Sequence, residues 1–181
     1  MRKIVIYSDF DGVHNLPARL ITPENKEDTV SVKVETTSSL LKPSQDVYFN
    51  EQVRDNFNDL LSTGLFDLTW HTTWNDGDSI VHAAEKIGIN PGGAEVVISE
   101  TDFNHDARGK KDWTEWKARY IIEDQKINPR PFVWIDDEAT KFWDLEILGN
   151  VRSPGLIIQP KSRVGLTRAH ILEIIEFAQK Q

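Results

Sequence analysis

Apolar residues follow two patterns that alternate along the chain. Continuous apolar runs, rich in β-branched and aromatic residues, predict buried strands at 4–7, 66–72, 94–99, 132–135 and 156–159. Apolar residues at helical spacing predict helices between Asn50 and Gly64, over 80–87, from Asp112 to about Asp124, over about 138–148, and after Thr167. Strands that alternate with helices predict a doubly wound α/β fold, a parallel sheet with helices on both faces.

Capping residues refine the ends of these helices. Asn50 and Thr167 have the side chains of helix N-caps, and Asp112 with Glu115 three residues later forms the pattern of a capping box. Gly64 and Gly88 stand where helices end. For the last helix we expect a core face made of Ile171, Leu172, Ile175 and Ala178.

Residues 16–48 interrupt the alternation after the first strand. Three prolines break this segment, and Thr29–Glu35 alternates valine with polar residues, which predicts a half-exposed strand of a β-hairpin flap or cap. We therefore expect residues 1–181 to form a single domain with one small insertion. The insertion is shorter than a globular cap, which favours a site open to a large substrate, although a small flap can also close over a metabolite.

Composition limits the chemistry. With 39% hydrophobic and 28% charged residues, the chain is typical of a soluble globular protein. Only four apolar residues follow Arg2 and Lys3, and no apolar run approaches the roughly 20 residues of a membrane span, so we expect a cytoplasmic protein without a membrane partner. The absence of cysteine excludes disulfides, thiolate zinc sites and a cysteine nucleophile. A metal would need oxygen or imidazole ligands.

The net charge of −8 argues against a broad electrostatic grip on nucleic acid. Two local basic clusters could still follow a nucleic-acid backbone, or be solvated surface: Arg108, Lys110 and Lys111, and Lys161, Arg163 and Arg168. Likewise, Trp74, Trp113 and Trp116 either stack on a base or belong to the core.

Polar pairs follow three of the predicted strands. They are Asp9 and Asp11, Thr72 and Thr73, and Asp136 and Asp137. Because the carboxyl ends of parallel strands meet at one edge of a sheet, we expect these groups to converge in a ligand site. Neighbouring carboxylates cost desolvation and repulsion, which a cation or a reacting phosphate compensates.

Two further residues are candidates for this site. Lys117 lies in the first turns of a predicted helix, where a cation opposes the helix dipole and an anion nearby would offset that cost. Lys110 and Lys111 compete with it as loop cations. His14, three residues after Asp11, either contacts substrate or is structural.

The order Asp-x-Asp, Thr, Lys and paired Asp resembles the four motifs of the haloacid dehalogenase (HAD) superfamily of phosphohydrolases. The segments at 68–74, 130–138 and 165–167 are more narrowly similar to the HAD domain of Swiss-army-knife RNA-repair proteins of bacteria and phages. The segment WKARYI followed by FVWIDDEAT is also similar to the phosphatase half of phage polynucleotide kinase-phosphatases. The resemblance implies a HAD-like Rossmannoid fold.

The resemblance also implies roles for single residues. Asp9 would be the nucleophile that forms an aspartyl-phosphate, and Asp11 the general acid and base. The metal, most simply Mg²⁺, would be held by Asp9, the main-chain carbonyl of Asp11, and Asp136. Asp137 would bind the metal or orient one of its waters, or it would act only as a helix N-cap.

The remaining implied roles concern the phosphate. Thr72, or alternatively Thr73, and Lys117 would bind its oxygens, and Gly12 would let the backbone turn tightly beneath it. The expected substrate is the phosphorylated 3′ or 5′ end of RNA or DNA, in a repair or phage context. A phosphatase for nucleotides or other small metabolites is the alternative. A non-catalytic domain that binds a phosphorylated partner is a third hypothesis, disfavoured because a binder needs no Asp11 acid.

Overall fold

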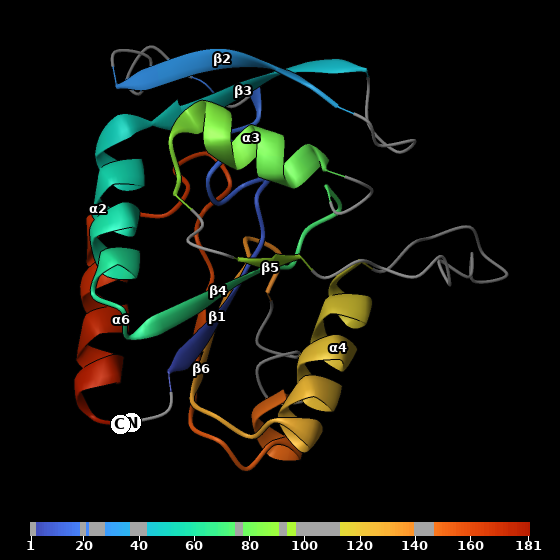
Figure 1. The fold of residues 1–181 in the computed structure, drawn as a ribbon, viewed down its shortest axis with the longest axis vertical. Coiled ribbons are helices and arrows are strands. Elements are labelled where there is room, and N and C mark those ends of the chain that lie inside the picture. The colour runs from blue at the N-terminus through green and yellow to red at the C-terminus, as the bar shows by residue number, and fades with distance from the viewer. Residues whose placement is uncertain are drawn as a thin grey trace, which may run out of the picture.

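The sheet has five parallel strands in the order β5-β4-β1-β6-β7 (Figure 1). The structure is a computed structural model that describes residues 3–18, 21, 28–36, 43–74, 78–90, 94–96, 113–139 and 147–181. The strands are β1 (Ile4–Ser8), β4 (Phe66–Trp70), β5 (Glu95–Val96), β6 (Phe132–Ile135) and β7 (Gly155–Ile158). The predicted α/β class with a parallel sheet is confirmed.

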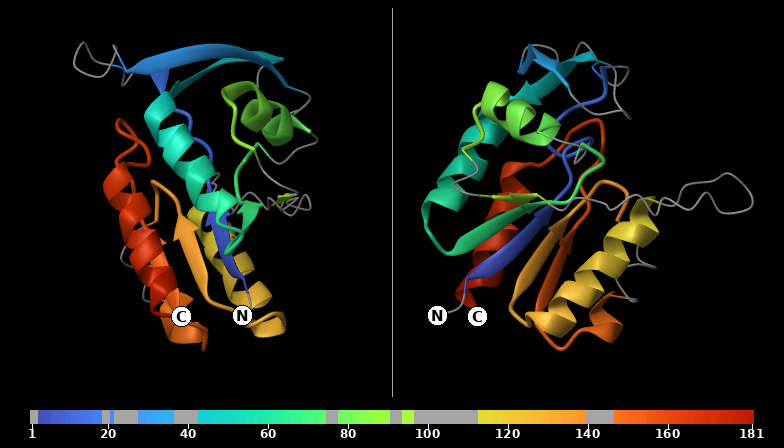
Figure 2. Two further views of the ribbon diagram at one scale, coloured as in Figure 1. Left: turned by 60° about the vertical axis from the view of Figure 1, so that its left-hand side comes forward. Right: turned by 45° about the vertical axis from the view of Figure 1, so that its right-hand side comes forward.

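Helices cover both faces of this sheet. The helices are α2 (Glu51–Ser62), α3 (Ser79–Ile87), α4 (Trp113–Ile127) and α6 (Arg168–Gln179). Strand β1 explains the layers, because its side chains alternate between faces: Ile4 and Ile6 join the core of α2, α3 and α6, whereas Val5 and Tyr7 join the core of α4. Figure 2 shows α4 on the opposite side of the sheet from α2 and α6.

Capping side chains explain where two helices begin. The side chain of Asn50 accepts a hydrogen bond from the Val53 N–H, and Thr167 forms a capping box with His170. In α6 the prediction for Leu172 was wrong, because its side chain is 51% exposed and Ile174 is buried instead. Each helical residue turns by 100°, so the residue next to Ile171 points away from the face that 171, 174 and 178 share.

Several element boundaries differ from the prediction or lie outside the described residues. Strand β4 ends at Trp70, because its neighbour β1 ends at Ser8 and the His71 N–H makes the last bond to the Ser8 carbonyl, at 2.8 Å. Residues 97–99 of the third predicted strand, and Asp112 and the Glu115 side chain of the capping box, lie outside the described residues. Residues 137–138 form a turn rather than the start of a helix, and residues 147–150 are helical.

The insertion after β1 contains the predicted hairpin, β2 (Thr29–Glu35) paired antiparallel with β3 (Ser44–Asn50). It lies over α3 at the carboxyl end of the sheet (Figure 1). Its Val34, Val47 and Phe49 are buried in the same core as the sheet. The hairpin is therefore fixed to the sheet by apolar packing and leads directly into α2. Among the described helices, none has both the length and the apolar character to cross a membrane.

Candidate active site

The site lies where the winding of the sheet reverses. From β1 the chain goes to β4 and β5 on one side, and then returns to β6 and β7 on the other. Asp9 follows β1 and Asp136 follows the adjacent β6, and their N–H groups bond to the Ile135 carbonyl at 2.8 Å and the Ile158 carbonyl at 3.1 Å. This switch point is the usual ligand crevice of an open α/β sheet, and the sequence prediction places its carboxylates there.

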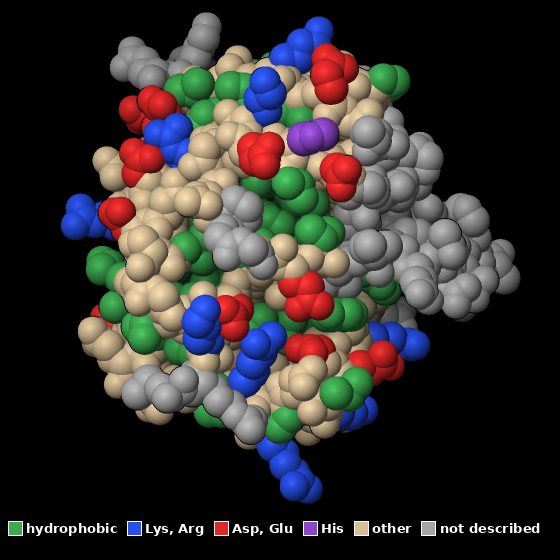
Figure 3. All heavy atoms as spheres, in the orientation of Figure 1, with side chains coloured by type: hydrophobic (Ala, Val, Ile, Leu, Met, Phe, Trp, Pro, Cys, Tyr) green, Lys and Arg blue, Asp and Glu red, His purple; other side chains and the backbone are tan. Residues whose placement is uncertain are grey.

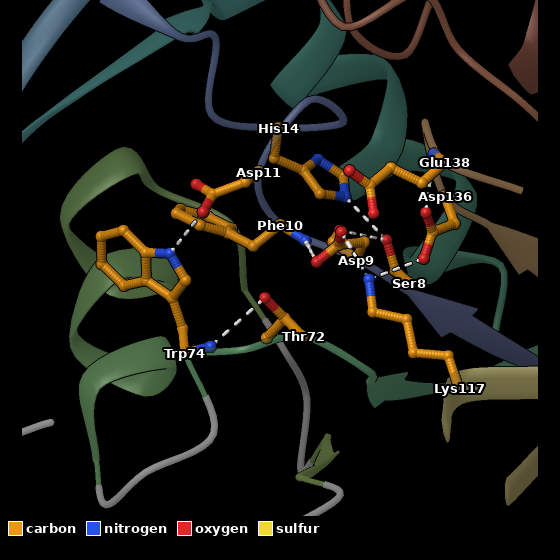
Figure 4. A network of polar contacts seen from close by, with 10 residues as sticks. All are labelled: Ser8, Asp9, Phe10, Asp11, His14, Thr72, Trp74, Lys117, Asp136 and Glu138. Carbon is orange, nitrogen blue, oxygen red and sulfur yellow. Dashed lines mark hydrogen bonds and ion pairs between the residues drawn. The ribbon is translucent and has the colours of Figure 1, made fainter. Parts of the chain in front are cut away.

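Lys117 joins the two strand ends through its ammonium group (Figure 4). Its Nζ lies 2.6 Å from Asp9 Oδ2 and 2.7 Å from Asp136 Oδ2, and its side chain is almost completely buried. Burial lowers the pKa of Lys117, but the two carboxylates outweigh burial and the pKa is raised. Burial raises the pKa of Asp136 to about 7, although Lys117 acts in the opposite direction. The competing Lys110 and Lys111 lie outside the described residues.

The carboxylates fit a divalent cation. Asp9, Asp136 and Asp137 each offer an oxygen within 4.8 Å of the others, and Asp9 and Asp136 are buried. Carboxylate oxygens are the ligands that hard cations prefer. Because three carboxylates face one ammonium here, an added positive charge would offset their repulsion. The carboxylate of Asp11 is not part of this group, and the sequence-based prediction gave only its main-chain carbonyl as a ligand.

Asp11 has different partners. Its Oδ2 accepts a hydrogen bond from Trp74 Nε1 at 2.9 Å, and its Oδ1 accepts one from Asn15 Nδ2 at 2.7 Å. Burial and the nearby Asp9 raise the pKa of Asp11 to about 6, although both donors act to lower it. Sequence analysis missed both partners, because nothing in the spacing of Trp74 or Asn15 marks them as partners of Asp11.

The structure shows why glycine is needed at position 12, which the sequence did not reveal. The φ of Gly12 is +72°, and a Cβ at this position would lie 2.2 Å from Cγ of Asp137. Only glycine therefore lets the Asp137 carboxyl lie against the turn after β1. Asp137 also accepts a hydrogen bond from the side chain of Ser162, and burial raises its pKa. A direct contact of Gly12 with phosphate stays a prediction.

The two candidate threonines differ in burial. Thr72 is fully buried and its Oγ1 accepts a hydrogen bond from the Trp74 N–H at 3.4 Å, whereas Thr73 is half-buried. Figure 4 shows Thr72 in the same network of residues as Asp9, Asp11 and Lys117. The role of either threonine in binding phosphate stays a prediction.

His14 and Trp74 belong to the core. His14 Nε2 lies 3.1 Å from Ser8 Oγ, which donates to the Asp9 carbonyl at 2.9 Å, and burial lowers the pKa of His14 to about 3. The Trp74 side chain is 1% exposed, so the base-stacking alternative is wrong for this residue. Trp116 is half-buried with its ring 5.0 Å from that of His71, and the Trp113 side chain lies outside the described ones.

Comparison with known proteins agrees with this geometry. A family model described as the HAD domain in Swiss Army Knife RNA repair proteins matches residues 5–171, which include all of the candidate site residues. Neither a curated protein nor a solved structure gives a significant match. The chain therefore belongs to the family of HAD domains found in Swiss Army Knife RNA repair proteins, and it is a HAD-type phosphatase.

Proposed function

We propose that the chain is a Mg²⁺-dependent phosphomonoesterase that removes the terminal phosphate of a polynucleotide through an aspartyl-phosphate on Asp9. One observation carries this proposal: the ammonium of Lys117 lies 2.6 Å from Asp9 and 2.7 Å from Asp136, beside an Asp11 that has separate partners. This arrangement provides a nucleophile, a positive charge and a separate proton donor at one sheet edge.

The proposed reaction has two displacements. A carboxylate oxygen of Asp9 forms a bond to phosphorus while the bond to the leaving oxygen breaks, and Asp11 gives its proton to that oxygen. Asp11 then takes a proton from water as the water oxygen attacks phosphorus and the bond to Asp9 breaks. The Lys117 ammonium and the Thr72 hydroxyl stabilise the phosphoryl oxygens during both steps.

Mg²⁺ would be held by the carboxylates of Asp9, Asp136 and Asp137, together with the main-chain carbonyl of Asp11. When bound, it neutralises the negative charge of the phosphate oxygens. Lys117 contributes one positive charge next to the two carboxylates of Asp9 and Asp136. A bound phosphate would add further negative charge, which the proposed ion would help to neutralise.

Support for a polynucleotide end comes from the loop between β7 and α6. The Ser162 side chain bonds to the Asp137 side chain, Gln159 Nε2 bonds to the Asp137 carbonyl at 3.1 Å, and the Leu166 N–H bonds to the Val13 carbonyl at 2.9 Å. These bonds hold the loop against the site. In this proposal the exposed Lys161 and Arg163 of the loop contact phosphates beyond the terminal one.

A local basic contact also agrees with the net charge of −8. On the face seen in Figure 3, the described acidic and basic side chains are interspersed and form no large basic patch. Binding through a few residues next to the site needs no such patch.

Because the hairpin and the sheet share a core, we further propose that residues 1–181 form one domain. We also propose that the protein acts in the cytoplasm.

The test compares phosphate release from 3′-phosphorylated and 5′-phosphorylated oligonucleotides, mononucleotides and p-nitrophenyl phosphate, with Mg²⁺ and with EDTA. We expect Mg²⁺-dependent release from every ester and the highest kcat/KM on one oligonucleotide end. Charge reversal of Lys161 and Arg163 to Glu should lower kcat/KM on the oligonucleotide but not on p-nitrophenyl phosphate. The matched control reverses Lys126 and Lys180, exposed residues at the far ends of α4 and α6.

Each part of the proposal can fail separately. Phosphate release that persists in EDTA would contradict the metal dependence. Equal or faster turnover of mononucleotides would contradict the polynucleotide substrate and favour a metabolite phosphatase. Tight binding of a phosphorylated oligonucleotide without any phosphate release would contradict catalysis and favour a binding domain.

A further inference from the structure

We propose that Trp74 and Asn15 are positioning residues for Asp11, which orient its carboxyl group and assist the departure of leaving groups that need a proton. The inference rests on the proposed function, in which Asp11 gives a proton to the leaving oxygen. It adds two residues that the motifs of the sequence do not contain.

Trp74 provides the first fixed donor. Its indole Nε1–H, which can only donate, lies 2.9 Å from Asp11 Oδ2. The side chain is buried, and its ring packs edge to face against Phe10, with ring centroids 5.0 Å apart. Phe10 stands between Asp9 and Asp11 in the chain, so the same packing holds both the turn and the donor.

Asn15 provides the second donor, and the hairpin fixes its orientation. Asn15 Nδ2 lies 2.7 Å from Asp11 Oδ1, while Asn15 Oδ1 accepts the N–H of Tyr48 in β3 at 3.0 Å. The Leu16 N–H also donates to the Tyr48 carbonyl at 2.7 Å. Because the Tyr48 N–H needs an acceptor, the amide of Asn15 must turn its oxygen toward β3 and its NH₂ group toward Asp11. The insertion thus contributes to the site through Asn15.

The two donors act on proton transfer. A carboxylate oxygen has two lone pairs, so each oxygen of Asp11 can accept one of these bonds and still hold a proton. Bonds to both oxygens fix the rotation of the carboxyl group. When the O–H bond of Asp11 breaks and the proton joins the leaving alkoxide, both N–H groups already bond to the carboxylate that remains. No rearrangement is then needed to stabilise it.

The choice of leaving group isolates this effect. A strongly basic alkoxide, as in glycerol phosphate, needs a proton to leave, whereas p-nitrophenolate is a weak base and leaves without one. The readout is therefore the ratio of kcat/KM on glycerol phosphate to kcat/KM on p-nitrophenyl phosphate, since kcat/KM reports the first displacement and not the later attack of water, which is the same for both esters. A change that only disturbs folding or phosphate binding lowers both values and leaves the ratio unchanged.

The test uses two variants and a matched control. Trp74→Phe keeps a buried ring and removes the indole N–H, and Asn15→Ala removes the donor to Asp11 without adding a charge. The control is Trp70→Phe, because Trp70 also packs on Phe10, at 6.0 Å, and its Nε1 is buried with no hydrogen-bond partner in the described part of the chain. Asp11→Asn gives the largest change of the ratio that can be expected.

We expect Trp74→Phe and Asn15→Ala each to lower the ratio about tenfold, the scale of one hydrogen bond to a charged group, and Trp70→Phe to leave it unchanged. A ratio that both site variants leave at the wild-type value would overturn the inference. If the wild-type protein hydrolyses both esters, such a result leaves the proposed function intact. If the wild-type protein hydrolyses neither ester, the proposed function fails first and the inference with it.

Discussion

Asp9 and Asp11 are separated by one residue, yet their surroundings differ in kind. Asp9 faces the ammonium of Lys117 at 2.6 Å and also accepts the Phe10 N–H at 2.7 Å. Asp11 faces two neutral donors, the indole of Trp74 and the amide of Asn15. The first carboxyl group therefore has a full positive charge beside it, and the second has only dipoles.

This difference suits the two chemical roles proposed for this short turn. Contact with an ammonium favours the charged form of a carboxylate, which is the form that attacks phosphorus. A buried carboxyl group without a cation in contact holds its proton more strongly, and burial raises the pKa of Asp11 to about 6. The different partners of these two residues thus suit the different roles proposed for them.

The largest expected effect comes from replacing Asp9 and Asp11, one at a time, with asparagine. Asp9→Asn should lower kcat by about four orders of magnitude or more on every ester, as loss of a covalent nucleophile does. Asp11→Asn should lower kcat/KM on glycerol phosphate by about 10²- to 10⁴-fold, the usual contribution of a general acid, and kcat/KM on p-nitrophenyl phosphate much less. Steady-state phosphate release measures both.

Thermal unfolding of the two variants is the control, since both substitutions preserve the size of the side chain. The comparison of the two aspartates breaks down if Asp11→Asn lowers kcat/KM equally on both esters, because a donor of a proton to the leaving group cannot act equally on both. It also breaks down if Asp9→Asn retains wild-type turnover.

The sequence predicts the fold well where local signals and tertiary packing agree. Strand β6 was predicted with its exact bounds, since a continuous apolar run such as 132–135 suits a strand buried on both faces. Helix α2 begins after Asn50 because the capping side chain is a local interaction. Leu172 was predicted wrongly, because apolar character alone does not tell which of two neighbouring residues faces the core.

The candidate site follows the same rule. Asp9, Asp136 and Lys117 could be placed together from the sequence, because strand ends converge in this fold class and the motif order resembles a known family. The hydrogen bond from Trp74 to Asp11 could not be predicted from the sequence. The two residues are 63 positions apart, and they meet because the Trp74 ring packs on Phe10. The bond of Asn15 to β3 likewise depends on where the insertion packs.

A smaller effect is expected from the backbone at Gly12, in the turn that follows Asp9 and Asp11. Gly12 and Gly64 have φ values of +72° and +71°, but a Cβ on Gly12 would meet the Asp137 carboxyl at 2.2 Å, whereas one on Gly64 would meet nothing within 4 Å. Gly64→Ala should lower the free energy of unfolding by about 1 kcal/mol, the cost of a left-handed backbone. Gly12→Ala should lower it by about 2 kcal/mol or more, since Asp137 must also move.

Urea unfolding with and without Mg²⁺ measures both quantities. Because Gly12→Ala displaces one proposed metal ligand, we expect Mg²⁺ to stabilise this variant less than it stabilises Gly64→Ala. If the two variants lose equal stability and are stabilised equally by Mg²⁺, the contact between Gly12 and Asp137 contributes neither to folding stability nor to binding of the metal.

The smallest effect concerns His14, which lies beneath the turn that both aspartates share. The described side chains around it are Ser8 and the rings of Phe10, Phe57 and Trp70, and burial lowers its pKa from 6.5 to about 3. Below its unfolded pKa the unfolded chain binds a proton that the folded chain does not, so stability falls as the pH falls. From about pH 7.5 to about pH 5.5, His14 alone should remove about 1.4 kcal/mol from the free energy of unfolding.

His71 is buried with a pKa that is also lowered, so it should add a loss of the same sign. His14→Gln removes the share of His14 and should flatten the decrease of stability between these pH values, as measured by urea unfolding. An unchanged slope in this variant would mean that His14 is already protonated in the fold. The variant also sharpens the comparison of the two aspartates: if kcat of His14→Gln still falls in acid as in the wild type, the fall reports the site itself and not a loss of folded protein.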